Sequence, residues 1–453
     1  MRDSLHARLI YPAIMRTIGE YGMYAELDRL NALQYASREE ILESQGRKLE
    51  DILRYARQHV PRYRDALREA GSLGARDPLV LLRRIPFLTK EDLQNRLDDL
   101  MAEPQPRRTS RKTTGGSTGQ PVTVIKDAGA TAFERAATWM AYDWFGVRPG
   151  DRGARFWGSP REMGRRRLRF ALADIAMNRI RFSAFGVSES ELEGYWSNCL
   201  RFRPQYFYGY VSMLEAFGRF VEESGRDGTR LGLKAIITTS EILTGAQRDL
   251  LERVFAAPVQ NEYGCGEVGP IAYQCEAGGM HVMSENVFVE ILDEDDRPVG
   301  PGEEGEIVVT DLSNRAMPVL RYRIRDRAVR VETCTCGRGF PLLGDVRGRV
   351  YDSVRAPDGR FYHGEFFMYL FEDLRDEGLK FERFRVVQDS PRRVRIEVQA
   401  ANVNSDELAA VVQAKLGSRL PGMDVRVEVV EELQLPASGK LRIVENRVAS
   451  DVD

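Results

Sequence analysis

The chain has 453 residues, which is room for about three domains of ordinary size. Hydrophobic residues make up 43% and charged residues 30%, a composition that is typical of soluble globular proteins and excludes a mostly disordered chain. The formal net charge is −2, whereas nucleic-acid-binding proteins usually carry a basic excess, so we expect no nucleic-acid partner.

The N-terminal segment and the cysteine content bear on location. Residues 1–19 contain Arg2, Asp3, Arg8 and Arg16 and no clean apolar core, so they do not form a secretory signal. The longest apolar stretches are far short of the roughly 18 residues that a membrane span needs. Five cysteines are an odd number and a low density, which argues against a disulfide framework. We therefore expect a cytoplasmic protein with reduced thiols and no transmembrane segment.

The first hundred residues are predicted to be helical. Residues 20–70 carry apolar side chains three or four positions apart, and residues 86–100 suggest short helices with Thr89 near one start. The apolar positions of the first stretch include Leu42, Leu49, Ile52, Leu53 and Ala56. Residues 107–112 are polar and basic, so we expect a loop between this helical leader and the body of the protein.

The middle of the chain, residues 120–330, alternates short strand-like runs with helical stretches. This alternation favours an α/β core or a core with a mixed sheet. The expected strands are residues 121–125, 235–239, 287–292 and 305–310, and the expected helices are residues 130–145 and 243–255.

The last hundred residues have a different pattern. Strands are expected at residues 381–388, 393–398 and 425–430, with an amphipathic helix at residues 407–420. These elements suffice for a small α+β domain. We therefore predict an N-terminal domain over residues 1–350 and a C-terminal domain over residues 351–453.

The most specific local motif runs from Thr113 to Pro121 and contains three glycines and four hydroxyl side chains. Such a segment is a poor helix or strand, but it can turn several backbone amides toward one oxyanion such as a phosphate. It lacks the Lys-Ser/Thr pair of a Walker A loop, and a flexible surface loop is the alternative. The candidate phosphate-binding residues are Thr114, Gly115, Gly116, Ser117, Thr118 and Gly119.

Three further segments carry candidate functional residues. In residues 261–267, Tyr263 offers a flat face for a nucleobase and Glu267 offers an oxygen ligand for Mg²⁺. Asp326 follows a basic, aromatic stretch and is able to accept hydrogen bonds from ribose hydroxyls. Lys440 lies in a Gly/Ser/Pro loop. Taken singly, each is equally compatible with a turn, a salt-bridged strand or a solvated lysine.

Four residues form a candidate metal site. Cys334 and Cys336 make a tight Cys-x-Cys, and Cys275 and His281 precede them with five residues between. Three thiolates and an imidazole fit tetrahedral Zn²⁺ in a closed, structural site. The alternative is four unrelated reduced groups, and Cys265 is a further candidate ligand.

An aromatic cluster is a candidate substrate pocket. Tyr208, Gly209 and Tyr210 lie in one run, and Trp139 and Trp157 are candidates to join them in lining a pocket for an apolar or aromatic acid. Core packing explains these side chains equally well.

In this order and at these distances, the motifs resemble the adenylate-forming (acyl-CoA synthetase-like) superfamily, and more narrowly its phenylacetate-CoA ligase and CapK-like branch. The resemblance covers most of the chain and implies a large N-terminal domain with a small mobile C-terminal lid. It implies that ATP and Mg²⁺ are cofactors. It also assigns roles: residues 114–119 to the β- and γ-phosphates, Ser240 and Glu241 to the adenine edge, Tyr263 to stacking on adenine, Glu267 to Mg²⁺, Asp326 to the ribose, Arg349 to the nucleotide, Asp352 to the hinge and Lys440 to adenylation.

The implied reaction joins a carboxylic acid to AMP with release of pyrophosphate, and the lid then removes Lys440 and admits an acceptor. CoA is one acceptor, but residues 353–360 depart from the Gly-Val-Asn type stretch of the thiol-ligase members. An amide or ester synthetase with an amine or hydroxyl acceptor, activation of another oxyanion, and a nucleotide-binding module without catalysis therefore stay open. Lys440 argues against the nucleotide-binding module, because a protein that only binds nucleotide does not need the adenylation lysine. A homodimer is also left open.

Overall fold

A computed structural model describes residues 6–69, 77–114, 122–157, 173–347, 354–358, 360–362, 364–400, 404–431, 433 and 444–448. Its largest feature is an 11-stranded mixed sheet with the order β11-β12-β13-β14-β10-β9-β8-β7-β6-β3-β4. The strands of its parallel half are β3 (Gly153–Phe156), β4 (Arg179–Phe182), β6 (Tyr206–Tyr210), β7 (Ala235–Thr239) and β8 (Val259–Cys265). The antiparallel half contains β9 (Gly269–Gln274), β10 (Met280–Val282), β11 (Val287–Leu292), β12 (Glu304–Asp311), β13 (Tyr322–Val331) and β14 (Leu342–Arg347).

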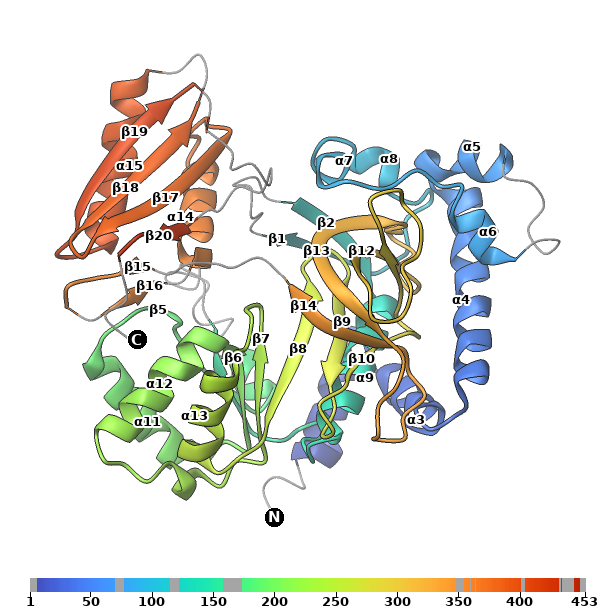
Figure 1. The fold of residues 1–453 in the computed structure, drawn as a ribbon, viewed down its shortest axis with the longest axis horizontal. Coiled ribbons are helices and arrows are strands. Elements are labelled where there is room, and N and C mark those ends of the chain that lie inside the picture. Colours follow the sequence, from blue (N-terminus) through green and yellow to red (C-terminus); the bar gives the residue numbers. More distant parts are fainter. Residues whose placement is uncertain are drawn as a thin grey trace.

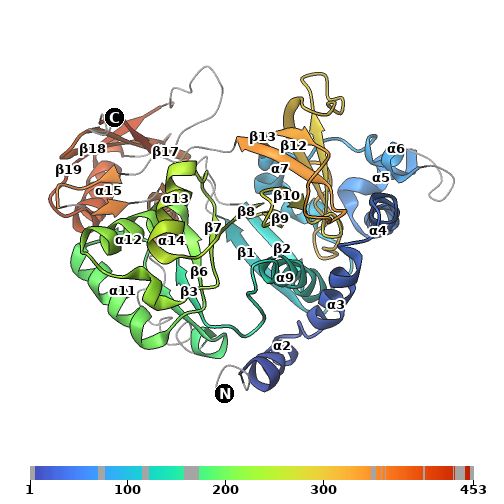
Figure 2. The same cartoon turned by 60° about the horizontal axis from the view of Figure 1, so that its bottom comes forward.

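The parallel half of the sheet is covered on both faces. Phe207 and Ile236 pack with α11 (Glu189–Phe202), α12 (Val211–Glu223) and α13 (Gly245–Phe255), which lie together in Figures 1 and 2. The neighbouring Tyr206 and Ile237 point the other way and pack with α9 (Ala128–Asp143). This period-two alternation is expected of strands that are buried on both faces. A short 3₁₀ helix, η3 (Gly228–Leu231), precedes β7.

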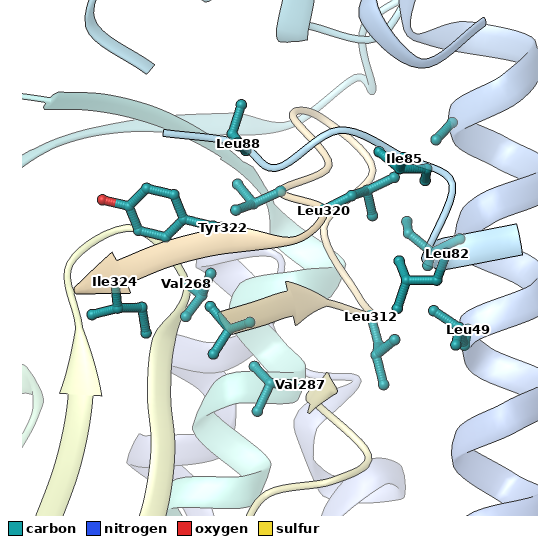
Figure 3. Packing of buried hydrophobic residues seen from close by; sticks show 14 of the residues in the cluster. Leu49, Leu82, Ile85, Leu88, Val268, Val287, Leu312, Leu320, Tyr322 and Ile324 are labelled. Carbon is teal, nitrogen blue, oxygen red and sulfur yellow. The ribbon is translucent and has the colours of Figure 1, made fainter. Parts of the chain in front are cut away.

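The antiparallel half packs against the N-terminal helices. In Figure 3, Leu49 of the long helix α4 and Leu82 of α6 face Leu312 and Leu320, which flank β12 and β13. α4 begins with a capping box formed by Ser37 and is amphipathic, as the sequence predicted. The helices of this region are η1 (His6–Ile10), α2 (Tyr11–Ile18), α3 (Met23–Leu33), α4 (Arg38–His59), α5 (Pro61–Glu69), α6 (Pro78–Leu82), α7 (Lys90–Asn95) and α8 (Leu97–Leu100).

The expectation of a loop at residues 107–112 is wrong. Residues 109–114 form β1 (Thr109–Thr114), which pairs antiparallel with β2 (Val122–Asp127) from Thr109↔Asp127 to Thr114↔Val122. β2 buries Val122 and Val124, so it supplies both the packing and the hydrogen-bonding partner. β1 gains its structure from pairing while the side chains of residues 109–113 stay exposed, which is why the polar composition wrongly suggested a loop.

The C-terminal part has its own core. The sheet β19-β18-β17-β20 packs against two helices through Phe367, Phe371, Phe384 and Leu416, among others. Its elements are α14 (Gly364–Asp376), β17 (Arg383–Ser390), β18 (Arg393–Gln399), α15 (Ser405–Arg419), β19 (Asp424–Val430) and β20 (Val444–Asn446). The three predicted strands and the predicted helix are present, whereas α14 and β20 were not predicted.

A small sheet connects this C-terminal part to the parallel half. β15 (Val354–Arg355) pairs with β16 (Phe361–Tyr362), and β16 pairs with β5 (Phe185–Val187) from the middle of the chain. In Figure 1 the three strands lie between the C-terminal sheet and α12. The predicted fold class, α/β with mixed α+β parts, is confirmed. The proposed domain boundary at residue 350 falls outside the described residues. No described helix combines the length and the apolar character needed to span a membrane.

Candidate active site

A cavity of about 1310 Å³ opens where the parallel strands end. It lies along the carboxyl ends of β3, β6, β7 and β8, and side chains of α9 also line it. Ligands of open α/β sheets bind in this position, because the loops that follow the strands converge there. The residues that line the cavity come from both halves of the large sheet.

Two of the predicted nucleotide residues meet in this cavity. The Tyr263 hydroxyl, at the end of β8, donates a hydrogen bond to Asp326 Oδ2 on β13 at 3.1 Å. The two residues are 63 positions apart in sequence, and the sheet order brings them together through β9, β10 and β14. An aromatic ring beside a carboxylate is a suitable arrangement for a nucleoside, which offers a flat base and two ribose hydroxyls.

Ser240 and Glu241 line the same cavity directly after β7. Ser240 has φ 68°, a left-handed conformation that ends the strand with a sharp turn. Glu241 Oε2 accepts a hydrogen bond from the backbone nitrogen of Ser212 in the first turn of α12 at 2.6 Å. The turn is therefore fixed to the sheet and to a helix, as a binding loop requires.

Glu267 is nearly buried and lines the cavity just beyond β8. Burial, and secondly the negative charge of Glu267, raise the pKa of the neighbouring Cys265 thiol. A carboxylate held in a cavity beside a neutral thiol fits Mg²⁺, which prefers oxygen ligands.

The predicted phosphate loop begins at the end of β1. Thr114 is the last residue of that strand, and Lys112 and Thr113 just before it line the cavity. Behind the hairpin, buried Lys126 of β2 donates to the Val268 carbonyl at 2.9 Å and forms an ion pair with Glu134 of α9. These contacts hold β2 in place, and β1, which pairs with it, therefore ends at the cavity. Gly115, Gly116, Ser117, Thr118, Gly119, Arg349, Asp352 and Lys440 lie outside the described residues.

Beyond the nucleotide residues the cavity is aromatic. Trp139 and Tyr142 of α9, Trp157 after β3, and Tyr208 of β6 line it. Tyr210 is fully buried and stacks on Trp157 with ring centroids 4.3 Å apart. Gly209 is not among the lining residues: a Cβ there would lie 2.6 Å from the Phe156 carbonyl oxygen, so it permits β3 and β6 to pack closely.

Glu262 also lines this aromatic part, and the sequence reasoning did not find it. Its carboxylate accepts hydrogen bonds from the hydroxyls of Tyr142 at 3.1 Å, Thr239 at 3.1 Å and Tyr208 at 3.3 Å. Burial raises the pKa of Glu262, and the hydroxyl donors offset part of that effect. One feature of the sequence could have indicated Glu262: it is an acidic side chain within a strand, at a position that faces the interior of the protein.

Comparisons with known proteins give a consistent answer. No family model matches the chain. It is 29% identical over 336 residues to a phenylacetate-coenzyme A ligase of Thermus thermophilus, covering 71% of this chain and 73% of the relative. It is 22% identical to Protein CapK of Staphylococcus aureus, covering 67% and 65%, and 26% identical to a phenylacetate-coenzyme A ligase of Escherichia coli, covering 66% and 69%. A crystal structure of 2-hydroxyisobutyryl-CoA ligase with 2-HIB-AMP and CoA matches with a TM-score of 0.60 and 19% identity over 92% of this chain and 91% of that one.

The chain is thus similar, over about two thirds of its length, to phenylacetate-coenzyme A ligases and to Protein CapK. The resemblance that its motifs carried is thereby confirmed. The likeness to the solved structure extends over nearly the whole chain, so the chain has the fold of that ligase.

Outside the cavity lining, the fold brings together the four residues of the predicted metal site. The ligand atoms of Cys275, His281, Cys334 and Cys336 all lie within 4.8 Å of one another. Cys336 Sγ is 3.1 Å from His281 Nε2, and His281 Nδ1 lies 3.3 Å from the Phe340 carbonyl oxygen. A proton on Nδ1 would leave Nε2 free to bind a metal. Burial lowers the pKa of His281 to about 4, so the imidazole is neutral at pH 7.

Proposed function

We propose that this adenylate-forming ligase uses ATP to activate a carboxylic acid as acyl-AMP, with release of pyrophosphate, and transfers the acyl group to CoA. The observation that carries the proposal is a single cavity in which the Tyr263–Asp326 pair adjoins an aromatic pocket. The nucleotide and the acid would lie end to end along the carboxyl edge of the sheet.

The chemistry follows from the positions of the side chains. The acid carboxylate attacks the α-phosphorus of ATP in line and pyrophosphate leaves, a reaction that depends on positioning and charge stabilisation. We infer that Tyr263 stacks on adenine, that Asp326 accepts hydrogen bonds from the ribose hydroxyls and that Ser240 and Glu241 border the adenine. Glu267 would hold Mg²⁺, whose charge offsets that of the phosphates.

The remaining roles extend the proposal to residues outside the described ranges. Residues 114–119 would hold the β- and γ-phosphates, Arg349 would contact the nucleotide, and Lys440 would stabilise the transition state. We further propose domains over residues 1–350 and 351–453 with Asp352 as the hinge, so that one rotation removes Lys440 and admits the acceptor. A cytoplasmic location and a homodimer stay predictions.

The role of Lys440 provides the test of this function. Lys440→Ala should slow acid-dependent pyrophosphate exchange by about 10²–10³-fold, the usual effect of removing one stabilising donor. Lys380→Ala removes an exposed lysine from the same C-terminal part and should leave the exchange rate unchanged. An undiminished rate in Lys440→Ala would remove that residue from its role, and the absence of exchange with any acid in the wild type would refute the ligase activity.

The acceptor is decided by a second measurement on the same enzyme. Thioester formation with CoA supports the proposal, and the names of the relatives favour it. The departure of residues 353–360 from the thiol-ligase pattern favours an amine or hydroxyl acceptor. Release of AMP with hydroxylamine or an amine, but not with CoA, would identify the enzyme as an amide or ester synthetase.

We also propose that Cys275, His281, Cys334 and Cys336 bind a structural Zn²⁺. The set has the donor types and the spacing of a closed tetrahedral site. Its ligands come from the β9–β10 hairpin and from the loop between β13 and β14. Zinc would therefore clamp two neighbouring hairpins at one end of the large sheet. Cys265 is not part of this cluster.

A further inference from the structure

The carboxylate of Glu262 lines the aromatic part of the cavity. The residue lies on β8 directly before Tyr263, so it is one position from the nucleotide site but on the opposite side of the strand's pleat. Part of its surface is open to the cavity. An acid whose carboxylate reacts beside Tyr263 would extend its other end toward Glu262.

The hydrogen bonds to Glu262 come from neutral hydroxyl groups. Oε1 accepts from Thr239 and Tyr208, whereas Oε2 accepts from Tyr142. Tyr273 also hydrogen-bonds the carboxylate, and its hydroxyl lies 2.9 Å from that of Thr138, so it has two partners. A donor on a ligand can take the place of the Tyr273 hydroxyl, because Tyr273 then keeps Thr138 as a partner.

No positive charge neutralises this carboxylate within the part of the chain that the structure describes. No lysine, arginine or histidine there forms an ion pair with Glu262. The Arg155 guanidinium lies over the face of the Tyr208 ring, 4.7 Å from its centroid, while Tyr208 presents its hydroxyl to Glu262. An uncompensated carboxylate in an aromatic pocket costs free energy, and a donor on the ligand would reduce that cost.

We propose that the acid which this enzyme activates carries a hydrogen-bond-donating group, a hydroxyl or an amine, remote from its reacting carboxylate, and that Glu262 binds that group. This inference rests on the proposed function and specifies its substrate class. Tyr142, Tyr208 and Thr239 are positioning residues, because their hydroxyls hold the carboxylate in one orientation.

Matched aryl acids test the inference. Phenylacetate, 4-hydroxyphenylacetate and 4-aminophenylacetate, together with the corresponding benzoates and 3-substituted isomers, are compared in acid-dependent pyrophosphate exchange. The wild type should prefer at least one donor-bearing acid over its unsubstituted partner by about 10–10² in kcat/KM, the usual effect of a hydrogen bond to a charged group. Whether the hydroxyl or the amine acid is preferred distinguishes the two donors.

Variants of the pocket show whether Glu262 is responsible. Glu262→Leu should abolish the preference by lowering the rate with the donor-bearing acid alone. Tyr142→Phe removes one of the hydrogen bonds that orient the same carboxylate but leaves its acceptor, so it should reduce the preference without abolishing it. Equal kcat/KM within every pair in the wild type overturns the inference while leaving the ligase activity intact. An equal loss with both acids in Glu262→Leu also overturns it. If Glu262→Leu does not fold, the comparison of matched acids in the wild type still tests the inference. Glu262→Gln tests it as well, because this variant should lose any preference for an amine.

Discussion

Glu262 illustrates how a single side chain can oppose folding and still define a site. Burial raises the pKa of its carboxyl group, which means that the folded protein disfavours the charged form. The hydroxyls of Tyr142, Tyr208 and Thr239 offset this only in part, because they are neutral donors. A glutamine at this position would offer an acceptor to the same hydroxyls without carrying a charge. The presence of a carboxylate is therefore better explained by binding than by stability.

This view predicts the stability of Glu262→Gln. Because the pKa of Glu262 is higher in the folded than in the unfolded protein, stability falls as the pH rises from the ordinary glutamate value, about 4.3, through the raised value. Glutamine cannot titrate, and Tyr142, Tyr208 and Tyr273 stay neutral over this range because burial raises their pKa values too. Thermal unfolding should show that Glu262→Gln is more stable than the wild type at pH 7, by a margin that shrinks near pH 4.5. A variant that is less stable by the same margin at both pH values would contradict this.

The same residues show how far the sequence could predict the site. Tyr263, Glu267 and Asp326 lie in recognisable motifs, and the structure places all three at one cavity. Glu262 lies inside one of those motifs and was missed, because its meaning depends on Tyr142, Tyr208 and Thr239 from three other elements. No local sequence pattern predicts that Glu262 lies beside these three residues. Their contact follows from the order of strands in the sheet and from the packing of α9 on it.

At the scale of elements, pairing decides structure where local composition does not. The hydrophobic periodicity of α4, α9 and α15 was sufficient to predict helices, since each has a face to bury. β1 has no buried face among its described side chains and exists because β2 supplies its hydrogen bonds. The Cys/His cluster depends on both local sequence and strand pairing. The spacing of its residues was visible in the sequence, but the pairing of β10 with β14 brings the four ligands together.

The zinc proposal predicts the effect of removing one ligand of that cluster. Purified protein should contain about one zinc ion per chain, and Cys334→Ser should lose most of it and unfold at a lower temperature, since a structural metal contributes to folding. Cys199 is buried in the hydrophobic core between the parallel strands and helices α11 to α13, and it is not one of the four ligands. Cys199→Ala should therefore lower stability without changing the metal content. Elemental analysis together with thermal unfolding measures both quantities. Protein that contains no zinc, and whose unfolding temperature is unaffected by a chelator, would refute the site.

At the scale of the whole molecule, the C-terminal part is connected to the parallel half by strand pairing as well as by the covalent chain. β16 and β5 are adjacent in Figure 1. They pair with Phe361 opposite Val187. Backbone pairing of this kind fixes orientation, and only a few residues contribute to it. A lid that rotates between two half-reactions would have to break this pairing or carry it through the motion. If the C-terminal part is the proposed lid, this pairing belongs to one of its positions.

A reversible cross-link between β5 and β16 tests that consequence. In Val187→Cys/Phe361→Cys the two thiols occupy paired positions of neighbouring antiparallel strands, where a disulfide is geometrically accessible. Oxidation should slow one half-reaction, either pyrophosphate exchange or transfer from preformed acyl-AMP, by at least about 10-fold, and a reductant should restore it. The two single-cysteine variants, treated identically, account for oxidation of the five native cysteines. If the fully cross-linked enzyme performs both half-reactions at the rate of the reduced enzyme, the lid does not need to leave β5, and rotation about Asp352 is not part of the cycle.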